Sequence, residues 1–100
     1  MRYLTVTANF MGTGLKDKFE GQLNPDELYL TMDLRLEISS WNKAYQPVIS
    51  MSFDDRHSNA DLIKSLDDQG LTIARKIKKF LGDDYKIDYY SEGQLMHLLV

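Results

Sequence analysis

Residues 58–81 read SNADLIKSLDDQGLTIARKIKKFL, and this stretch carries the strongest indication of how the chain folds. Its apolar residues recur three and four positions apart, which is the spacing of one face of an α-helix. We therefore expect one long amphipathic helix here, closed by Gly82 in a left-handed conformation. The expected apolar face consists of Leu62, Ile63, Leu66, Ile73, Ala74, Ile77, Phe80 and Leu81.

Three features inside this stretch lead to more specific predictions. Ser58 followed by Asp61 matches a capping box at the start of the helix. Gly70 costs a helix about 1 kcal/mol relative to alanine, so the sequence predicts a kink there or close packing against a strand. The acidic pair Asp67-Asp68 is interpreted as solvated on the helix surface.

Three segments before the helix alternate between apolar and polar residues, which is typical of β-strands. Arg2–Phe10 predicts a half-buried strand. Leu28–Ile38 alternates without a fault, so a second strand is expected there. Gln46–Phe53 predicts a third strand, and Pro47 must lie at its start or on an edge because proline cannot donate to the sheet.

The connections between these strands are also predicted. Asn24-Pro25 could equally begin a helix, but the alternation that follows it favours a turn. Trp41–Tyr45 is expected to connect the second and third strands. Met11–Glu27 is long for a connection in so small a domain, and such loops are often functional or mobile. A binding role and a simple connection both stay open for it.

After Gly82 the chain is expected to end in a β-hairpin. Its strands are Tyr85–Tyr90 and Gln94–Val100, joined by Ser91-Glu92-Gly93. Both faces of the last strand are apolar. This predicts a position in the centre of the sheet or at a dimer interface.

Together these elements predict a single α+β domain over residues 1–100. We expect two layers, a mostly antiparallel sheet of about five strands and one long amphipathic helix, in the order β-β-β-α-β-β. One helix covers only one face of the sheet, so the opposite face is expected to be open to solvent or to a partner. That face would consist of Tyr3, Thr5, Thr7, Tyr29, Thr31, Asp33, Arg35 and Glu37.

Composition and charge exclude several classes of protein. A net charge of −3 gives no overall field to attract a nucleic-acid backbone. The absence of cysteine excludes a disulfide scaffold, a thiolate metal site and a cysteine nucleophile. There is no signal-peptide pattern and no apolar run of the length that a membrane span needs. We therefore expect a cytoplasmic protein.

Residues suited to catalysis are few. Histidine is the side chain that titrates nearest neutrality, and His57 and His97 are the only two, neither of them beside a recognisable nucleophile. Asp54, Asp55 and His57 could converge on a divalent cation, but helix capping explains the same residues. We predict no catalytic residues, no cofactor and no metal site, with a small metal- or ligand-binding enzyme as an alternative.

By elimination, the sequence predicts a small non-enzymatic interaction protein. It would act as a regulator or inhibitor by binding another protein, and it would form a homodimer. The alternative is a nucleic-acid-binding module that uses the open sheet face and the basic C-terminal end of the helix. The candidate interaction surface consists of Lys16, Lys18, Phe19, Tyr29, Arg35, Trp41, Lys76 and Lys79.

Overall fold

The computed structural model describes residues 1–100 as an α+β domain, as predicted. The strands are β1 (Arg2–Val6), β2 (Leu15–Asp17), β3 (Gly21–Gln22), β4 (Tyr85–Ser91) and β5 (Met96–Leu98). The helices are the 3₁₀ helix η1 (Pro25–Leu28) and the α-helices α1 (Met32–Ile49), α2 (Phe53–Ser58) and α3 (Ala60–Leu81). The chain therefore has two long helices where the sequence predicted one. None of its helices combines the length and the apolar character needed to cross a membrane.

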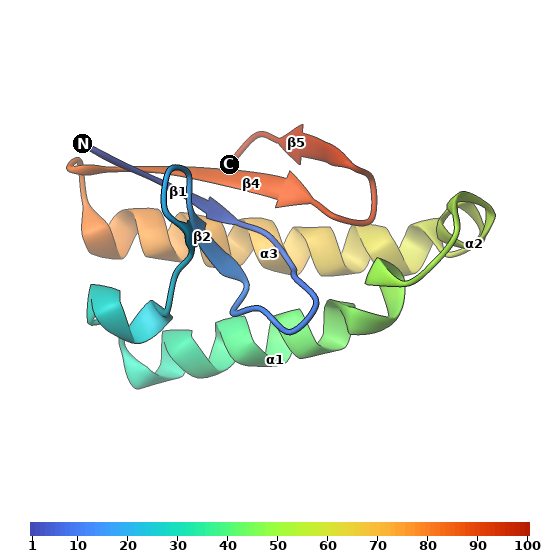
Figure 1. Cartoon of the computed structure of the whole chain (residues 1–100), viewed down its shortest axis with the longest axis horizontal. Helices are drawn as coiled ribbons and strands as arrows, with labels where there is room; N and C mark the ends of the chain where they lie inside the picture. The colour runs from blue at the N-terminus through green and yellow to red at the C-terminus, as the bar shows by residue number, and fades with distance from the viewer.

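The five strands form one sheet in the order β3-β2-β1-β4-β5. β1 and β4 are parallel, and the other neighbours are antiparallel. Figure 1 shows α1 and α3 running side by side, with β4 and β5 along the side of α3 that faces away from α1. Leu4 of β1 and Ile87 of β4 are buried against this helical layer. The helices thus cover one face of the sheet and leave the other open.

The predicted long helix is confirmed as α3, but its start differs. Ser58 ends a separate short helix, α2, and Asn59 precedes α3 without a side-chain capping bond. The predicted capping box of Ser58 and Asp61 is therefore wrong. The capping serine is Ser52, whose hydroxyl accepts a hydrogen bond from the backbone N–H of Asp55 at 3.2 Å and so starts α2. Gly82 closes α3 with the expected positive φ of 77°, but its ψ of −160° lies outside the left-handed helical region that was predicted.

The strand predicted over Leu28–Ile38 is wrong, because most of this segment belongs to α1. The Thr31 hydroxyl caps that helix by accepting a hydrogen bond from the backbone N–H of Leu34 at 3.2 Å. Leu36 sits on the exposed side, with 58% of its surface accessible. Met32 and Leu36, two apolar residues of the alternating run, therefore face solvent and not the core. The face that is buried follows the helical spacing: Leu34, Ile38, Trp41, Tyr45 and Val48.

The strand predicted over Gln46–Phe53 is also wrong. α1 continues to Ile49, with Pro47 inside its last turn. Proline has no backbone N–H to donate to the carbonyl four residues earlier, and α1 ends two residues after Pro47. Trp41–Tyr45 accordingly lies in the middle of α1 instead of connecting two strands.

The segment Met11–Glu27 has more structure than a loop. It contains β2 and β3, and the Asn24 side chain accepts a hydrogen bond from the backbone N–H of Asp26 at 3.0 Å to cap η1. The helix-start signal at Asn24-Pro25 was therefore real, although it begins a 3₁₀ helix. The predicted terminal hairpin is confirmed as β4 and β5, but β5 is at the edge of the sheet, and a central position for it is wrong.

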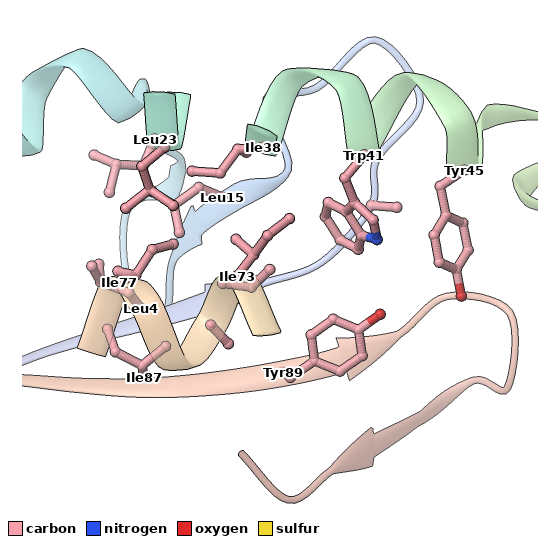
Figure 2. Close-up of a cluster of buried hydrophobic side chains, with 14 of the residues drawn as sticks. Leu4, Leu15, Leu23, Ile38, Trp41, Tyr45, Ile73, Ile77, Ile87 and Tyr89 are labelled. Atoms are coloured by element: carbon pink, nitrogen blue, oxygen red, sulfur yellow. The ribbon is translucent and has the colours of Figure 1, made fainter. Parts of the chain in front are cut away.

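The core lies between α1, α3 and the sheet (Figure 2). Trp41 of α1 faces Tyr89 of β4, with ring centroids 6.1 Å apart. The indole N–H of Trp41 donates to the backbone carbonyl of Leu66 at 2.8 Å. The predicted close packing at Gly70 is confirmed, because a Cβ there would lie 2.6 Å from the Tyr89 hydroxyl.

Candidate functional site

The face of the sheet turned away from α1 and α3 is open to solvent. Alternation along the strands puts Leu4 and Ile87 into the core and their neighbours Thr5 and Asp88 onto the open face. Thr5 lies opposite Lys16 of β2 on one side and opposite Asp88 of β4 on the other. Lys16, Thr5 and Asp88 therefore form one row across three strands.

A hollow of about 660 Å³ lies in this face, and we call it the open-face hollow. Its lining is almost entirely polar or charged, so it offers hydrogen bonds and ion pairs to a partner more than apolar contact. The lining residues are Thr5, Thr7, Asn9, Lys16, Lys18, Asp88, Tyr90, Glu92 and His97.

The charges around the open-face hollow are separated by strand. Lys16 and Lys18 lie on the β2 side, and neither takes part in any salt bridge of the structure. Asp88 lies in β4, and its carboxylate oxygen is 2.9 Å from Nδ1 of His97. Glu92 comes directly after the last residue of β4 and also lines the hollow. The hollow thus has free ammonium groups on one side and carboxylates on the other.

Aromatic side chains lie beside these charges. Tyr3 and Phe19 meet edge to face with ring centroids 6.0 Å apart, and the Lys18 ammonium is 5.5 Å from the Tyr3 centroid. Tyr90 and His97 form a second edge-to-face pair at 5.0 Å. Phe19 has 78% of its surface accessible. Tyrosine is among the residue types enriched at the energetic centres of protein interfaces.

The turn that carries Lys18 and Phe19 is held by the buried side chain of Asp17. This carboxylate accepts hydrogen bonds from the backbone N–H groups of Phe19 at 2.9 Å and Glu20 at 3.1 Å, and from Nε of Arg2 at 3.1 Å. These bonds, the one from Phe19 foremost, hold the pKa of Asp17 below its ordinary value. Ionised Asp17 therefore fixes the position of Lys18 beside the hollow.

On the core side, β4 is fixed by the carboxylate of Asp67 in α3, which is only 2% exposed. One oxygen accepts hydrogen bonds from the hydroxyls of Tyr89 at 2.6 Å and Tyr45 at 2.8 Å. The other accepts from the Ser91 hydroxyl at 2.7 Å and the Gln94 amide at 2.8 Å. Burial, above all, raises the pKa of both phenols, which keeps them protonated as donors. The interpretation of Asp67 as solvated is therefore wrong.

The turn between β4 and β5 is held by Arg56 of α2. Its guanidinium donates to the backbone carbonyls of Ile49 at 3.1 Å and of Glu92. The backbone N–H of Gly93 donates to the Tyr45 hydroxyl at 2.8 Å. Side chains from α1 and α2 thus set the position in which the hairpin presents Glu92 and β5.

The structure brings together only part of the predicted interaction surface. Lys16, Lys18 and Phe19 lie on or beside the open sheet face. Trp41 is wrong as a surface residue, because only 2% of it is exposed and its indole is tied into the core. A large apolar ring on the buried face of α1 contributes more to the core than it could to a surface.

The remaining predicted surface residues belong to the helical layer. Tyr29 lies next to η1 and is 87% exposed. Arg35 of α1 pairs with Asp26 at 2.8 Å. Lys76 of α3 pairs with Glu37 of α1 at 2.9 Å.

Lys79 lies near the C-terminal end of α3 and lines a separate groove between α1 and α3 together with Phe80. Because α3 packs under the sheet, this basic helix end and the open sheet face are on different sides of the domain. The two parts of the predicted nucleic-acid surface therefore do not form one surface.

Part of the predicted open face is confirmed. Tyr3 and Thr5 point outward from β1, and Thr7 lines the hollow although it is largely buried. The rest of the prediction is wrong, because those residues lie between η1 and α1 or within α1 instead of in a strand. They are Tyr29, Thr31, Asp33, Arg35 and Glu37.

Sequence reasoning missed Asp88, Tyr90 and His97 as members of this face. The signal was available, since polar Lys86 and Asp88 alternate with apolar Ile87 and Tyr89 in the predicted strand. What the sequence did not show is that β4 lies next to β1, which places these residues beside Thr5.

The residues considered for a cation, Asp54, Asp55 and His57, lie in α2. No group of three or more potential ligand side chains comes close enough together to hold a metal ion. The Ser52 cap and the acidic first turn account for the N-terminal part of this helix.

A small α+β domain with one face of its sheet left polar and open has the architecture of a binding module. The chain matches the family model described as "Serratia CdiI immunity protein-like" over residues 7–92 and belongs to that family. Among curated proteins, no sequence matches the chain. Membership of an immunity-protein family agrees with the predicted interaction protein that binds a partner.

Proposed function

We propose that this protein is an immunity protein that binds a toxin and blocks it by direct contact. The observation that carries this proposal is the family match, which spans residues 7–92 and so includes every helix and the strands β2, β3 and β4. Such a protein acts as an inhibitor without turnover, in keeping with the predicted absence of catalytic residues. The cytoplasmic location expected from the sequence is retained as part of the proposal.

The open sheet face is the binding surface that the geometry supports best. It presents unpaired lysines and partly exposed tyrosines on a base held in place by buried bonds. A surface that is already fixed before binding loses less entropy on association than a mobile one. Asp17 fixes the turn beside Lys18, and Asp67 fixes β4 with Asp88 and Tyr90.

The proposal is tested by producing candidate toxin domains in cells with and without this protein, and a toxin domain that it neutralises is called its cognate toxin. Cells that express the toxin domain should survive only when this protein is produced with it. The purified pair should elute as one complex with a fixed molar ratio, and light scattering would give the copy number of each chain. A complex that survives nuclease treatment separates protein binding from contact through nucleic acid.

Two results would contradict the proposal. One is unchanged toxicity when this protein is produced in excess. The other is neutralisation at amounts far below one protein per toxin molecule, which would indicate turnover and hence an enzyme. A matched control is an unrelated domain of similar size and net charge, produced at the same level.

A further inference from the structure

The open sheet face arranges its charges in two parallel banks. The lysine bank consists of Lys16 and Lys18 at β2, and the acidic bank consists of Asp88 and Glu92 at β4. Thr5 of β1 lies between them, level with Lys16 and Asp88. A trough floored by a short hydroxyl side chain therefore runs along β1, with opposite charges on its two sides.

The width of this trough corresponds to one helix. Neighbouring strands are about 4.8 Å apart, so β2 and β4, which are separated by β1 alone, lie about 10 Å apart. An α-helix with its side chains is about 10–12 Å across. A helix lying along β1 would thus bring one flank to each bank.

The two banks differ in how far their charges are already neutralised. Neither lysine of the lysine bank has a carboxylate partner within the chain. In the acidic bank, Asp88 contacts His97 at 2.9 Å and Glu92 is 3.8 Å from Arg56. The lysine bank therefore has more unpaired charge than the acidic bank, so a partner gains most by placing carboxylates opposite the lysine bank.

Resting on the proposed function, we propose that the trough seats one α-helix of the toxin. This helix carries Asp or Glu on the flank that faces Lys16 and Lys18, and a basic side chain on the flank that faces Asp88. The spacing of the banks sets the shape of the occupant, and the signs of the banks set its orientation. The opposite orientation would place like charges together on both sides.

The first test reverses the charge of each bank. K16E/K18E should weaken binding of the cognate toxin at least tenfold, mainly through slower association, and D88K should weaken it by a smaller factor. The matched control is R75E/K78E, which makes the same charge change on exposed positions of α3 and should leave affinity within about twofold. Circular dichroism and thermal melting show whether each variant is folded.

The dependence of affinity on salt gives a second readout. Binding of the unmodified protein should weaken as salt is raised, because both banks are exposed. K16E/K18E should lose most of this dependence, and reversal of the facing toxin carboxylates to lysine should restore tight binding. If K16E/K18E binds like the unmodified protein while R75E/K78E does not, the toxin uses the helical layer and the inference is wrong.

Cross-linking decides the shape of the occupant. The chain has no cysteine, so T5C and K18C each introduce a unique thiol on the open face, and T72C introduces one on the exposed side of α3 as the control. Toxin residues linked to T5C and K18C should fall three or four positions apart, as on one helix. Links spaced two apart would indicate a strand, and links from T72C alone would place the toxin on α3.

These outcomes separate the inference from the function on which it rests. Failure of the unmodified protein to bind or neutralise the toxin contradicts the proposed function itself. If the unmodified protein neutralises the toxin but the charge reversals in the two banks leave its affinity unchanged, only the seating of a helix in the trough is contradicted. The same holds if neutralisation is normal and the cross-linked toxin residues are two positions apart.

Discussion

The hydroxyl of Tyr89 donates a 2.6 Å hydrogen bond to the buried carboxylate of Asp67, and this bond joins β4 to α3 inside the domain. The same carboxylate also accepts from Tyr45 of α1, so three elements meet at one acceptor. No cation takes part, and the four side-chain donors to this carboxylate are all neutral. Because β4 carries Asp88 and Tyr90 on its other face, the arrangement of the core fixes the arrangement of the proposed binding surface.

Replacement of Asp67 by alanine should strongly destabilise the fold. Four donors would lose their acceptor, and each buried donor left without a partner costs about 1–3 kcal/mol. We expect the free energy of unfolding to fall by about 3 kcal/mol or more, as measured by urea denaturation. D68A is the control, because Asp68 is exposed and contributes only a surface ion pair with Lys64, so its effect should stay below about 1 kcal/mol. Similar values for D67A and D68A would contradict the role given to Asp67.

The domain should lose stability in alkali. The pKa values of Tyr45 and Tyr89 are raised by burial in the folded state, whereas both phenols ionise near pH 10 in the unfolded chain. The unfolded state then binds fewer protons than the folded state above about pH 10, so the free energy of unfolding decreases as pH rises further. Melting temperature measured against pH should show this decline.

The ultraviolet absorbance of ionised tyrosine offers a check on the same point. The phenolate signals of Tyr45 and Tyr89 should appear together with unfolding instead of before it. Y29F provides the control, because Tyr29 is 87% exposed and its removal should leave the alkaline transition in place. Ionisation of all phenols while the fold is intact would contradict the prediction.

The turn beside the lysine bank should loosen in acid. The pKa of Asp17 is lowered in the folded state by the bond from the Phe19 backbone N–H, followed by those from Glu20 and Arg2. Its contribution is therefore present above the ordinary aspartate pKa of about 4 and is lost as pH falls through the lower folded value. The protection factors of the Phe19 and Glu20 amides, which correct for the intrinsic pH dependence of exchange, should fall in that range.

D17N should show the same loss near neutral pH. The neutral amide is a weaker acceptor for the two backbone N–H groups, and it removes the charge that faces Arg2. We expect faster exchange of the Phe19 amide and weaker toxin binding than in D84N, a change in a carboxylate that is exposed near β4. Equal exchange in the two variants would show that Asp17 does not hold the turn.

Replacement of Gly70 by alanine should destabilise the domain although alanine favours helices. The new Cβ would collide with the Tyr89 ring, which is itself held by Asp67 and cannot move freely. Forcing an extra carbon into a packed core costs about 1–3 kcal/mol, more than the gain of about 1 kcal/mol in helix propensity. Q69A changes an exposed neighbour and should be nearly neutral. If G70A is more stable than the unmodified protein in urea denaturation, the Tyr89 ring moves away from the new Cβ at little cost in free energy.

Several features of the fold were predictable because local rules determine them. The periodicity of residues 58–81 predicts α3, Gly82 closes it, and the alternation of Arg2–Phe10 and Tyr85–Tyr90 predicts strands that the structure contains. The run Leu28–Ile38 led to a wrong prediction of a strand because its apolar residues alternate as they do in a strand. Only the packing of the folded chain shows which of these residues are buried. In α1, Leu34 and Ile38 are needed in the core, while Leu36 is left in solvent.

The sequence by itself determined the class of the domain, the long helix and the terminal hairpin, since each depends on residues near one another in the chain. The tertiary structure decided that β4 lies beside β1, that Asp67 is buried, and that Trp41 belongs to the core. These outcomes depend on contacts between distant segments. Lys16 and Asp88 share one face only because the chain returns through α1 and α3 to add β4 parallel to β1.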